Sequence, residues 1–126
     1  MDRLVGKALD ISGIARSLGT VMDLSAGDTL FREGDRPRCM YVLLDGQVAV
    51  RRRDLVIETV GPGQAIGILS LLDNEMRTVT AEARTACEVV AIDPRKFRFA
   101  VEEMPHFAWW VMGELAHRLR MTNAAL

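Results

Sequence analysis

Between Val21 and Ile92 the chain is divided into short apolar or alternating runs, each bounded by residues typical of turns. Runs of about four to eight residues with such boundaries predict β-strands, because a helix would show a longer stretch with a period of about 3.6 residues. The turn segments are Ser25–Asp28, Glu33–Asp35, Asp45-Gly46, Gly61–Gly63 and Arg84-Thr85. The expected strands are Val21–Leu24, Thr29–Arg32, Met40–Leu44, Gln47–Arg52, Leu55–Val60, Gln64–Ile66, Thr78–Arg84 and Cys87–Ile92.

Many short strands at regular spacing predict a mostly β fold with flanking helices. We expect an eight-stranded jelly-roll (double-stranded β-helix) barrel, since a parallel sheet would need helices between its strands. Asp45-Gly46, which lies between two β-rich runs, predicts a hairpin. The only basic run, Arg51-Arg52-Arg53, is interpreted as the solvated end of a hairpin.

Both ends of the chain show helical spacing. Asp93-Pro94 predicts a helix start, with Asp93 as N-cap and Pro94 at the first helical position, and Pro105 separates that helix from the last one. An N-terminal helix is predicted from the spacing of Leu4, Ala8, Ile11, Ala15 and Leu18. We therefore expect a single domain over residues 1–126, with the N-terminal helix at 1–19, the barrel at 20–92, a hinge helix at 93–104 and a long dimerisation helix at 105–126.

The last helix carries two apolar faces. One face is formed by Phe107, Trp110, Val111 and Leu119, and it can pack on the barrel of the same chain. A heptad seam is formed by Ala108, Met112, Leu115, Leu119, Thr122 and Leu126. A second apolar face needs a second surface, so we expect a homodimer through this helix; the alternative is that both faces are covered within the monomer.

The composition excludes several classes of function. A net charge of −1 and a pI near 6.1 give no global basic field, so no nucleic acid is expected to bind this chain alone. Cys39 and Cys87 lack the spacing of a metal site or a disulfide framework. No motif of an activated nucleophile or of metal ligands accompanies His106 and His117, so neither an enzyme nor a bound cofactor is expected. Without a signal segment or a membrane span, the chain is expected to be cytoplasmic, with no membrane partner.

The stretch Ala65–Thr80 has the pattern of an anion site. Gly67 allows a close approach of the backbone, and the first N–H groups of a short helical turn after it would have no intrahelical partner. Arg77 offers a bidentate fork to a phosphate, and Thr78 offers a hydroxyl beside it. The same residues also fit an ordinary turn between two strands, and the stretch alone does not separate the two interpretations.

Taken together, the chain resembles the cyclic nucleotide-binding domain family, which includes the sensor domain of the catabolite activator proteins and the regulatory subunits of protein kinase A. The resemblance covers nearly the whole chain and rests on Gly34-Asp35, Tyr41-Val42, Gly46–Val50, Gly61–Gln64 with Ile66-Gly67, Thr85–Val89 and the helix pair from Asp93 onward. It implies a small-molecule-sensing regulatory domain that binds a cyclic nucleotide such as cAMP, or a related small anion, and signals through its C-terminal helices.

The resemblance also implies roles for individual residues. Gly67 and Leu69 would offer backbone N–H groups to the cyclic phosphate, Arg77 would pair with it and Thr78 would add a hydroxyl. Thr122 matches a long-helix residue that reaches the base across the dimer seam. One position departs from the pattern: Ile68 stands where the family has a glutamate that accepts a hydrogen bond from the ribose, a bond that contributes about 1.5–3 kcal/mol.

Three interpretations stay open at this point. Nucleotide binding survives at reduced affinity, or another small anion takes its place, because the pairing at Arg77 is retained. Alternatively, the chain is a degenerate, ligand-free structural or interaction module, for which Ile68 is the main support. Members of the family that bind DNA continue into a helix-turn-helix domain, whereas this sequence stops at Leu126, so both a stand-alone sensor and the sensor fragment of a longer transcription regulator are possible.

Overall fold

The computed structural model of the chain describes residues 11–125, with side chains up to Thr122. Leu4, Ala8 and Leu126, which the sequence assigns to the two terminal helices, lie outside the described residues. The helices are α2 (Ile11–Leu18), α3 (Ile68–Asp73), α4 (Pro94–Glu103) and α5 (Pro105–Ala125). The strands are β1 (Thr20–Leu24), β2 (Thr29–Phe31), β3 (Met40–Asp45), β4 (Val48–Arg52), β5 (Leu55–Val60), β6 (Ala65–Ile66), β7 (Thr80–Ala83) and β8 (Cys87–Ile92).

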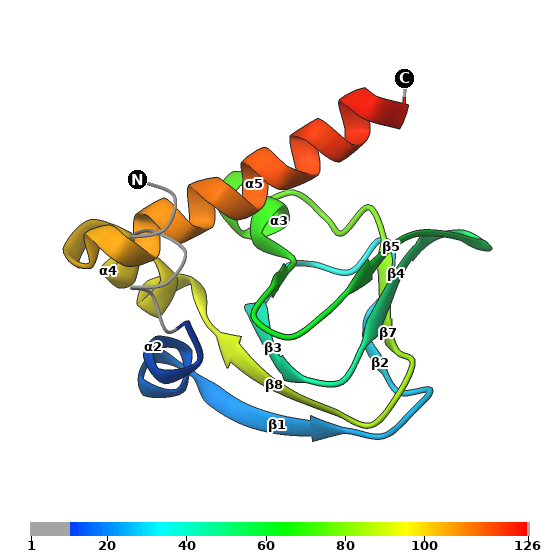
Figure 1. Ribbon diagram of the computed structural model, residues 1–126, viewed down its shortest axis with the longest axis horizontal. Helices are drawn as coiled ribbons and strands as arrows, with labels where there is room; N and C mark the ends of the chain where they lie inside the picture. Colours follow the sequence, from blue (N-terminus) through cyan, green and yellow to red (C-terminus); the bar gives the residue numbers. More distant parts are fainter. Residues whose placement is uncertain (1–10, 126) are drawn as a thin grey trace.

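The strands form two antiparallel sheets of four strands each, which lie against each other in Figure 1. Sheet A has the order β1-β8-β3-β6, and sheet B has the order β2-β7-β4-β5. A chain that passes back and forth between two such sheets is a double-sheet jelly roll. The predicted mostly β jelly-roll fold with an N-terminal helix and two C-terminal helices is therefore confirmed, except that the two sheets are not closed into a barrel.

The hairpin predicted at Asp45-Gly46 is wrong. β3, before this turn, pairs with β6 and β8 in sheet A, whereas β4, after it, pairs with β5 and β7 in sheet B. Gly46 has a φ of 94°, and a Cβ there would collide with the carbonyl of Ala86. A glycine is thus needed where the chain crosses from sheet A to sheet B and passes close to the start of β8. The local sequence does not reveal this close approach.

The central strands of sheet A, β3 and β8, are covered on both faces, which explains their nearly continuous apolar sequence. Side chains alternate along β3: Val42 lies in the cluster under the helices, and Leu43 lies in the cluster between the sheets. Val90 and Val89 alternate in the same way on β8. This is the period of two expected of a strand, with both faces apolar because helices cover one and sheet B covers the other.

The helices pack together on the outer face of sheet A (Figure 1). The predicted N-cap of α4 is present, since a carboxylate oxygen of Asp93 accepts a hydrogen bond from the Lys96 N–H at 2.9 Å. Phe107 and Val111 anchor the inner face of α5 in the cluster under the helices. The far end of α5 projects past the sheets, with α3 lying beneath its middle. Among the described helices, none has the length and apolar character needed to cross a membrane.

Candidate functional site

Arg77, in the coil between α3 and β7, is only 4% exposed although it carries a charged guanidinium. Its Nη1 donates a hydrogen bond to the Gly67 carbonyl at 2.9 Å, and its Nη2 donates to the Cys39 carbonyl. Its Cζ lies 4.1 Å from the centroid of the Phe31 ring. The guanidinium is therefore held between two carbonyl oxygens and an aromatic face.

No negative charge is paired with this buried guanidinium. None of the carboxylates in the described part of the chain forms an ion pair with Arg77, and its Nε is buried without a hydrogen-bond partner there. Burial lowers the pKa of Arg77, while Tyr41, Cys39 and Asp35 act on it in the opposite sense. Buried charges are normally paired, so an unpaired N–H on a buried cation is the feature expected of a site that receives an anion.

Gly67, which precedes α3, is the residue that makes room for this arginine. Its φ of 83° lies in the left-handed region, and a Cβ built on it would lie 2.5 Å from Nη1 of Arg77. Any other residue would be strained in its backbone and would press on the guanidinium. The structure thus brings together Gly67 and Arg77, two of the predicted site residues.

The main chain of Arg77 is fixed by the turn that follows β2. The N–H of Arg77 donates to the Asp35 carbonyl, and the Gly34 N–H donates to the Arg77 carbonyl, both at 2.8 Å. The aromatic and carbonyl partners of the guanidinium, Phe31 and Cys39, were missed from the sequence. The alternating run around Phe31 indicates only a strand, and no sequence signal marks a carbonyl as an arginine partner.

The other predicted site residues are less closely associated with Arg77. Leu69 lies in the first turn of α3 with its side chain 64% exposed. Thr78 is exposed, whereas the buried hydroxyl of this segment belongs to Thr80 and accepts a hydrogen bond from the Glu33 N–H at 3.1 Å. Thr122 is exposed near the end of α5, and within the described residues it forms no hydrogen bond with Arg77.

Ile68, which stands where the resemblance expects a ribose-binding glutamate, is a core residue. It is 1% exposed and lies in the core cluster with Phe107 and Val111 of α5. The adjacent Ile66 lies in the other cluster, between the sheets. Ile68 therefore forms part of the contact between α3 and the C-terminal helices.

Burial also shifts the pKa values of two ionisable groups beside Arg77. Burial raises the pKa of the Cys39 thiol, and Asp93 adds to the effect. Burial also raises the pKa of the Tyr41 phenol, whose ring stacks on Phe31 at a centroid distance of 6.2 Å. Among the described residues, no group of His, Cys, Asp and Glu has the composition of a metal site.

A separate cavity of about 370 Å³ lies between β5 and α5. It is lined by Val56, Ile57, Glu58, Thr59, Gln64, His117 and Met121. Arg77 does not line this cavity. Among the described residues, the cavity beside α5 and the site at the buried guanidinium are therefore separate.

Comparison with known proteins agrees with this architecture. A CRP-like cAMP-activated global transcriptional regulator of Mycobacterium tuberculosis is 30% identical over 118 residues, which is 90% of this chain and 52% of the regulator. The cAMP-dependent protein kinase regulatory subunit of Eremothecium gossypii is 37% identical over 75 residues, which is 60% of this chain and 16% of that protein. The chain thus spans about half the length of the first of these relatives, and both are regulatory proteins rather than enzymes.

Solved structures show the same likeness. The catabolite activator protein of Thermus thermophilus superposes with a TM-score of 0.82 at 25% identity and covers 99% of this chain and 61% of its own. The N-terminal domain of a transcriptional regulator from Streptomyces coelicolor A3(2) superposes with a TM-score of 0.69 at 32% identity, covering 98% and 92%. The sequence model of the cyclic nucleotide-binding domain matches residues 21–104, which extend from β1 to the end of α4. The chain therefore belongs to the cyclic nucleotide-binding domain family.

Proposed function

We propose that this chain is a regulatory sensor domain that binds a cyclic nucleotide, with cAMP as the first candidate, and holds its phosphate at Arg77. The observation that carries the proposal is the buried guanidinium of Arg77, which has an unpartnered Nε and no carboxylate partner within the described residues. Membership of the family supports the ligand class, and the regulatory nature of its relatives supports the sensing role.

The chemistry of a cyclic phosphate suits this site. A phosphate oxygen would supply the missing acceptor for Nε, and a second oxygen would take an Nη in a bidentate arrangement. In this proposal, the N–H groups of Gly67 and Leu69 and the hydroxyl of Thr78 complete the phosphate contacts, and Thr122 contacts the base. Because Ile68 lies in the core, the ribose hydroxyl must find its acceptor elsewhere. We therefore expect weaker binding than a glutamate at this position would give.

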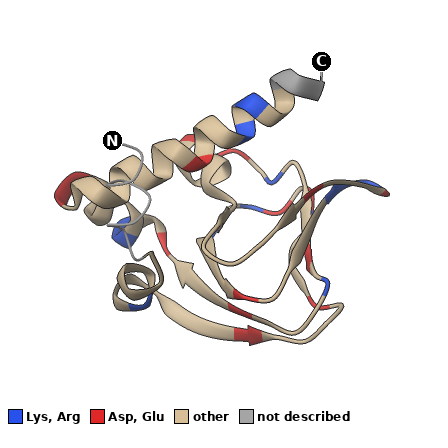
Figure 2. Cartoon of the chain, in the orientation of Figure 1, with Lys and Arg blue, Asp and Glu red and all other residues tan. Residues whose placement is uncertain are grey.

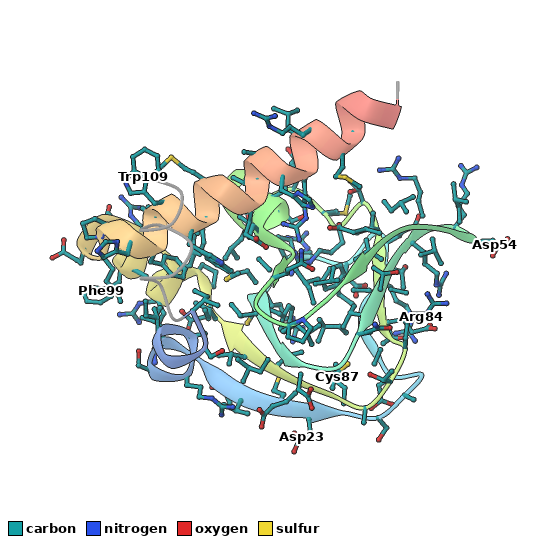
Figure 3. The ribbon with its side chains drawn as sticks, viewed as in Figure 1. Asp23, Asp54, Arg84, Cys87, Phe99 and Trp109 are labelled. Carbon is teal, nitrogen blue, oxygen red and sulfur yellow. The ribbon has the colours of Figure 1, made fainter. Side chains whose placement is uncertain are left out.

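Isothermal titration calorimetry with cAMP and with cGMP tests the proposal. We expect the unmodified chain to release or absorb heat with at least one of them at up to millimolar ligand. Arg77→Leu should abolish this heat, and Arg77→Lys should weaken binding roughly ten- to a hundredfold, because the bidentate contact with a charged group is lost. Arg84→Leu is the matched control, since Arg84 is exposed at the end of the sheets far from α3 in Figure 3.

A thermal melt of each variant separates loss of binding from loss of folding. If Arg77→Leu remains folded and binds as the unmodified chain does, the assignment of Arg77 as the phosphate ligand is wrong. If neither nucleotide gives heat with the unmodified chain, and neither raises its melting temperature as binding to the native state must, then a cyclic nucleotide is not the ligand.

One observation favours the second candidate function, a ligand-free structural module. Two nitrogens of Arg77 are already bonded to the carbonyls of Gly67 and Cys39, and its face is covered by Phe31. In that case, Arg77 connects three segments of the fold and needs no anion. The two functions predict opposite results in the same titration, because only the sensor would be stabilised by an added nucleotide.

We further propose that the chain forms a homodimer through α5. Trp109, Met112 and Leu119 are 62%, 48% and 63% exposed, and with the exposed Ala116 they follow the alternating spacing of three and four residues of a helical seam. Trp109 points away from the sheets in Figure 3. Two residues of the predicted seam, Ala108 and Leu115, are half-buried instead, and Leu115 packs against the core under the helices.

The proposed output is a movement of α4 and α5 when the ligand binds. Ile68 connects the start of α3 to the core that holds both helices, and this contact is the basis for the proposal. As the chain covers 52% of its mycobacterial relative, we propose that it can act as the sensor part of a larger regulator.

A further inference from the structure

Two side chains of α5 hold both polar main-chain groups of Ala65. A carboxylate oxygen of Glu114 accepts a hydrogen bond from the Ala65 N–H at 2.6 Å, and Nη2 of Arg118 donates one to the Ala65 carbonyl. Nε of Arg118 also donates to Glu58 of β5 at 3.4 Å. Glu114, Arg118 and Glu58 are called the α5 clamp below. The clamp connects α5 with β6 of sheet A and with β5 of sheet B.

The clamp forms because β6 is a short strand at the edge of sheet A. It contains only Ala65 and Ile66, and it pairs with β3 on one side. An edge strand presents N–H and C=O groups that have no neighbouring strand. Glu114 and Arg118 are four residues apart and share one face of α5, so a donor and an acceptor reach the same residue. Charged side chains thus take the place of the missing strand, and such charge-assisted bonds are stronger than neutral ones.

The clamped residue lies next to the proposed phosphate site. Ala65 precedes Gly67 by two residues, a separation of at most about 7 Å. The Gly67 carbonyl accepts the hydrogen bond from Nη1 of Arg77. The main chain from Ala65 to Gly67 thus joins the residue that α5 holds to the carbonyl that holds the guanidinium.

We propose that Glu114 and Arg118 are positioning residues that couple the placement of α5 to the state of Arg77 through the main chain from Ala65 to Gly67. This inference rests on the proposed function in one respect, namely that an anion is what changes the state of Arg77. An anion that draws the guanidinium away from the Gly67 carbonyl loosens this segment and alters the clamp. If binding of the anion changes the stability of the clamp by some factor, then by thermodynamic reciprocity releasing the clamp changes the affinity for the anion by the same factor.

The charges around Glu114 make the clamp sensitive to pH. Burial raises the pKa of Glu114, while the hydrogen bond from Ala65 and the charges of Arg118 and His117 act in the opposite sense, and Glu58 of β5 adds to the increase. A protonated Glu114 is a weaker acceptor for the Ala65 N–H, so the clamp is strongest when this carboxyl is ionised. Because burial raises the pKa of Glu114, the clamp weakens on acidification at a pH above the ordinary pKa of a glutamate.

The first experiment needs no ligand. The NMR resonance of the Arg77 Nε–H group reports the surroundings of the guanidinium, and amide hydrogen exchange at Ala65 and Gly67 reports how firmly the segment is held. We expect Glu114→Ala and Arg118→Ala to shift the Arg77 resonance and to accelerate both exchange rates. Glu114→Gln retains an acceptor oxygen but not the charge, so both readouts should fall between those of Glu114→Ala and those of the unmodified chain. Arg120→Ala is the control: it removes an exposed charge of the same helix and should change neither readout.

The second experiment is a titration with cAMP. We expect Glu114→Ala to change the dissociation constant by fivefold or more, the lower end of typical coupling between sites, and Glu114→Gln to change it less. If the Ala variants lower the melting temperature but leave the Arg77 resonance and the dissociation constant unchanged, the clamp is only a structural support and the coupling is disproved. If the unmodified chain binds no cAMP, the proposed ligand fails, and the clamp is still judged by the ligand-free resonance. Should Glu114→Ala not fold, Arg118→Lys, which keeps the charge but not the fork, takes its place, with a smaller shift expected.

Discussion

At the scale of single residues, Gly67 and Arg77 depend on each other. The glycine leaves the space that the guanidinium fills, and its carbonyl receives one of the guanidinium hydrogen bonds. The glycine and the arginine were predicted from the sequence as a pair because both residue types suit an anion site. Their direct contact was not predicted, since it depends on how α3 folds back between them.

Gly67→Ala should destabilise the protein more than a glycine replacement with the same backbone strain. Gly63 is the matched control, because its φ of 85° is nearly that of Gly67 at 83°, but a Cβ on Gly63 meets nothing within 4 Å. A non-glycine residue in this region costs about 1–3 kcal/mol at either site. Crowding against Arg77 should add about 1–3 kcal/mol at position 67 only. Chemical denaturation of both variants measures the difference, and equal values would show that Arg77 moves aside without loss.

Ile68 shows why sequence alone does not give the direction of side chains in this segment. The family pattern places Ile68 where a ribose-binding glutamate is expected, but a pattern fixes order along the chain and not the direction of a side chain. In the structure, the first turn of α3 directs Ile68 into the core with Phe107 and Val111, and Leu69 outward. The direction of each side chain at the start of α3 therefore depends on the packing of α5, which a sequence pattern does not contain.

Replacing these two neighbours tests that orientation. Ile68→Ala should lower the free energy of unfolding by about 2–5 kcal/mol, because it leaves a cavity in a closed core. Leu69→Ala should change it by about 0.5 kcal/mol or less, because Leu69 is 64% exposed. Denaturant titration measures both. A large effect at Leu69 with a small one at Ile68 would reverse the assignment of core and surface at the start of α3.

At the scale of elements, the strands were well predicted, but their partners were not. Leu55–Val60 and Cys87–Ile92 were predicted with their observed limits, because period-two alternation and turn residues are local signals. Asp45-Gly46 failed as a hairpin because the same dipeptide also suits a crossing between two sheets. Glu114 and Arg118 would be taken from sequence for a surface pair of a helix, and only the free edge of β6 explains why they turn inward.

The pKa of Glu114 gives the α5 clamp a signature in stability. Because burial raises this pKa in the folded state, the folded protein binds more protons than the unfolded chain as pH passes from the ordinary value of 4.5 to the raised value. The contribution of Glu114 to stability is therefore largest below this window and is lost as pH rises through it. Glu114→Gln removes the dependence, so its melting temperature relative to the unmodified chain should increase with pH. Glu103→Gln, at an exposed carboxylate of α4, should not show this trend, and parallel curves for the two variants would contradict the prediction.

At the scale of the whole molecule, the charges and the apolar residues are distributed unequally along α5. In the first half of this helix, Glu114 of the α5 clamp is the one residue among Asp, Glu, Lys and Arg, and this half is mostly tan in Figure 2, whereas the β4–β5 hairpin at the opposite side is strongly charged. The inner side of that half is used by Phe107 and Val111, so Trp109 and Met112 are left exposed on the other side. An uncharged, exposed helix face of this kind is typical of a surface that binds a second protein. The charge pattern was available from the sequence, but the division into an inner and an outer face depends on how α5 lies on sheet A.

If a second copy of the chain covers the seam of α5, a charge placed on that seam should dissociate the dimer. Leu119→Glu puts two carboxylates opposite each other at a seam position, where burial of unpaired like charges is strongly unfavourable. Sedimentation equilibrium should then give the mass of a monomer, whereas the unmodified chain gives that of a dimer. Phe99→Glu is the matched control, because Phe99 is a 55% exposed apolar residue on α4, outside the seam, and it should leave the dimer intact. A monomeric unmodified chain would show that the outer face of α5 does not bind a second copy. A dimer that survives Leu119→Glu would place the contact elsewhere on the molecule.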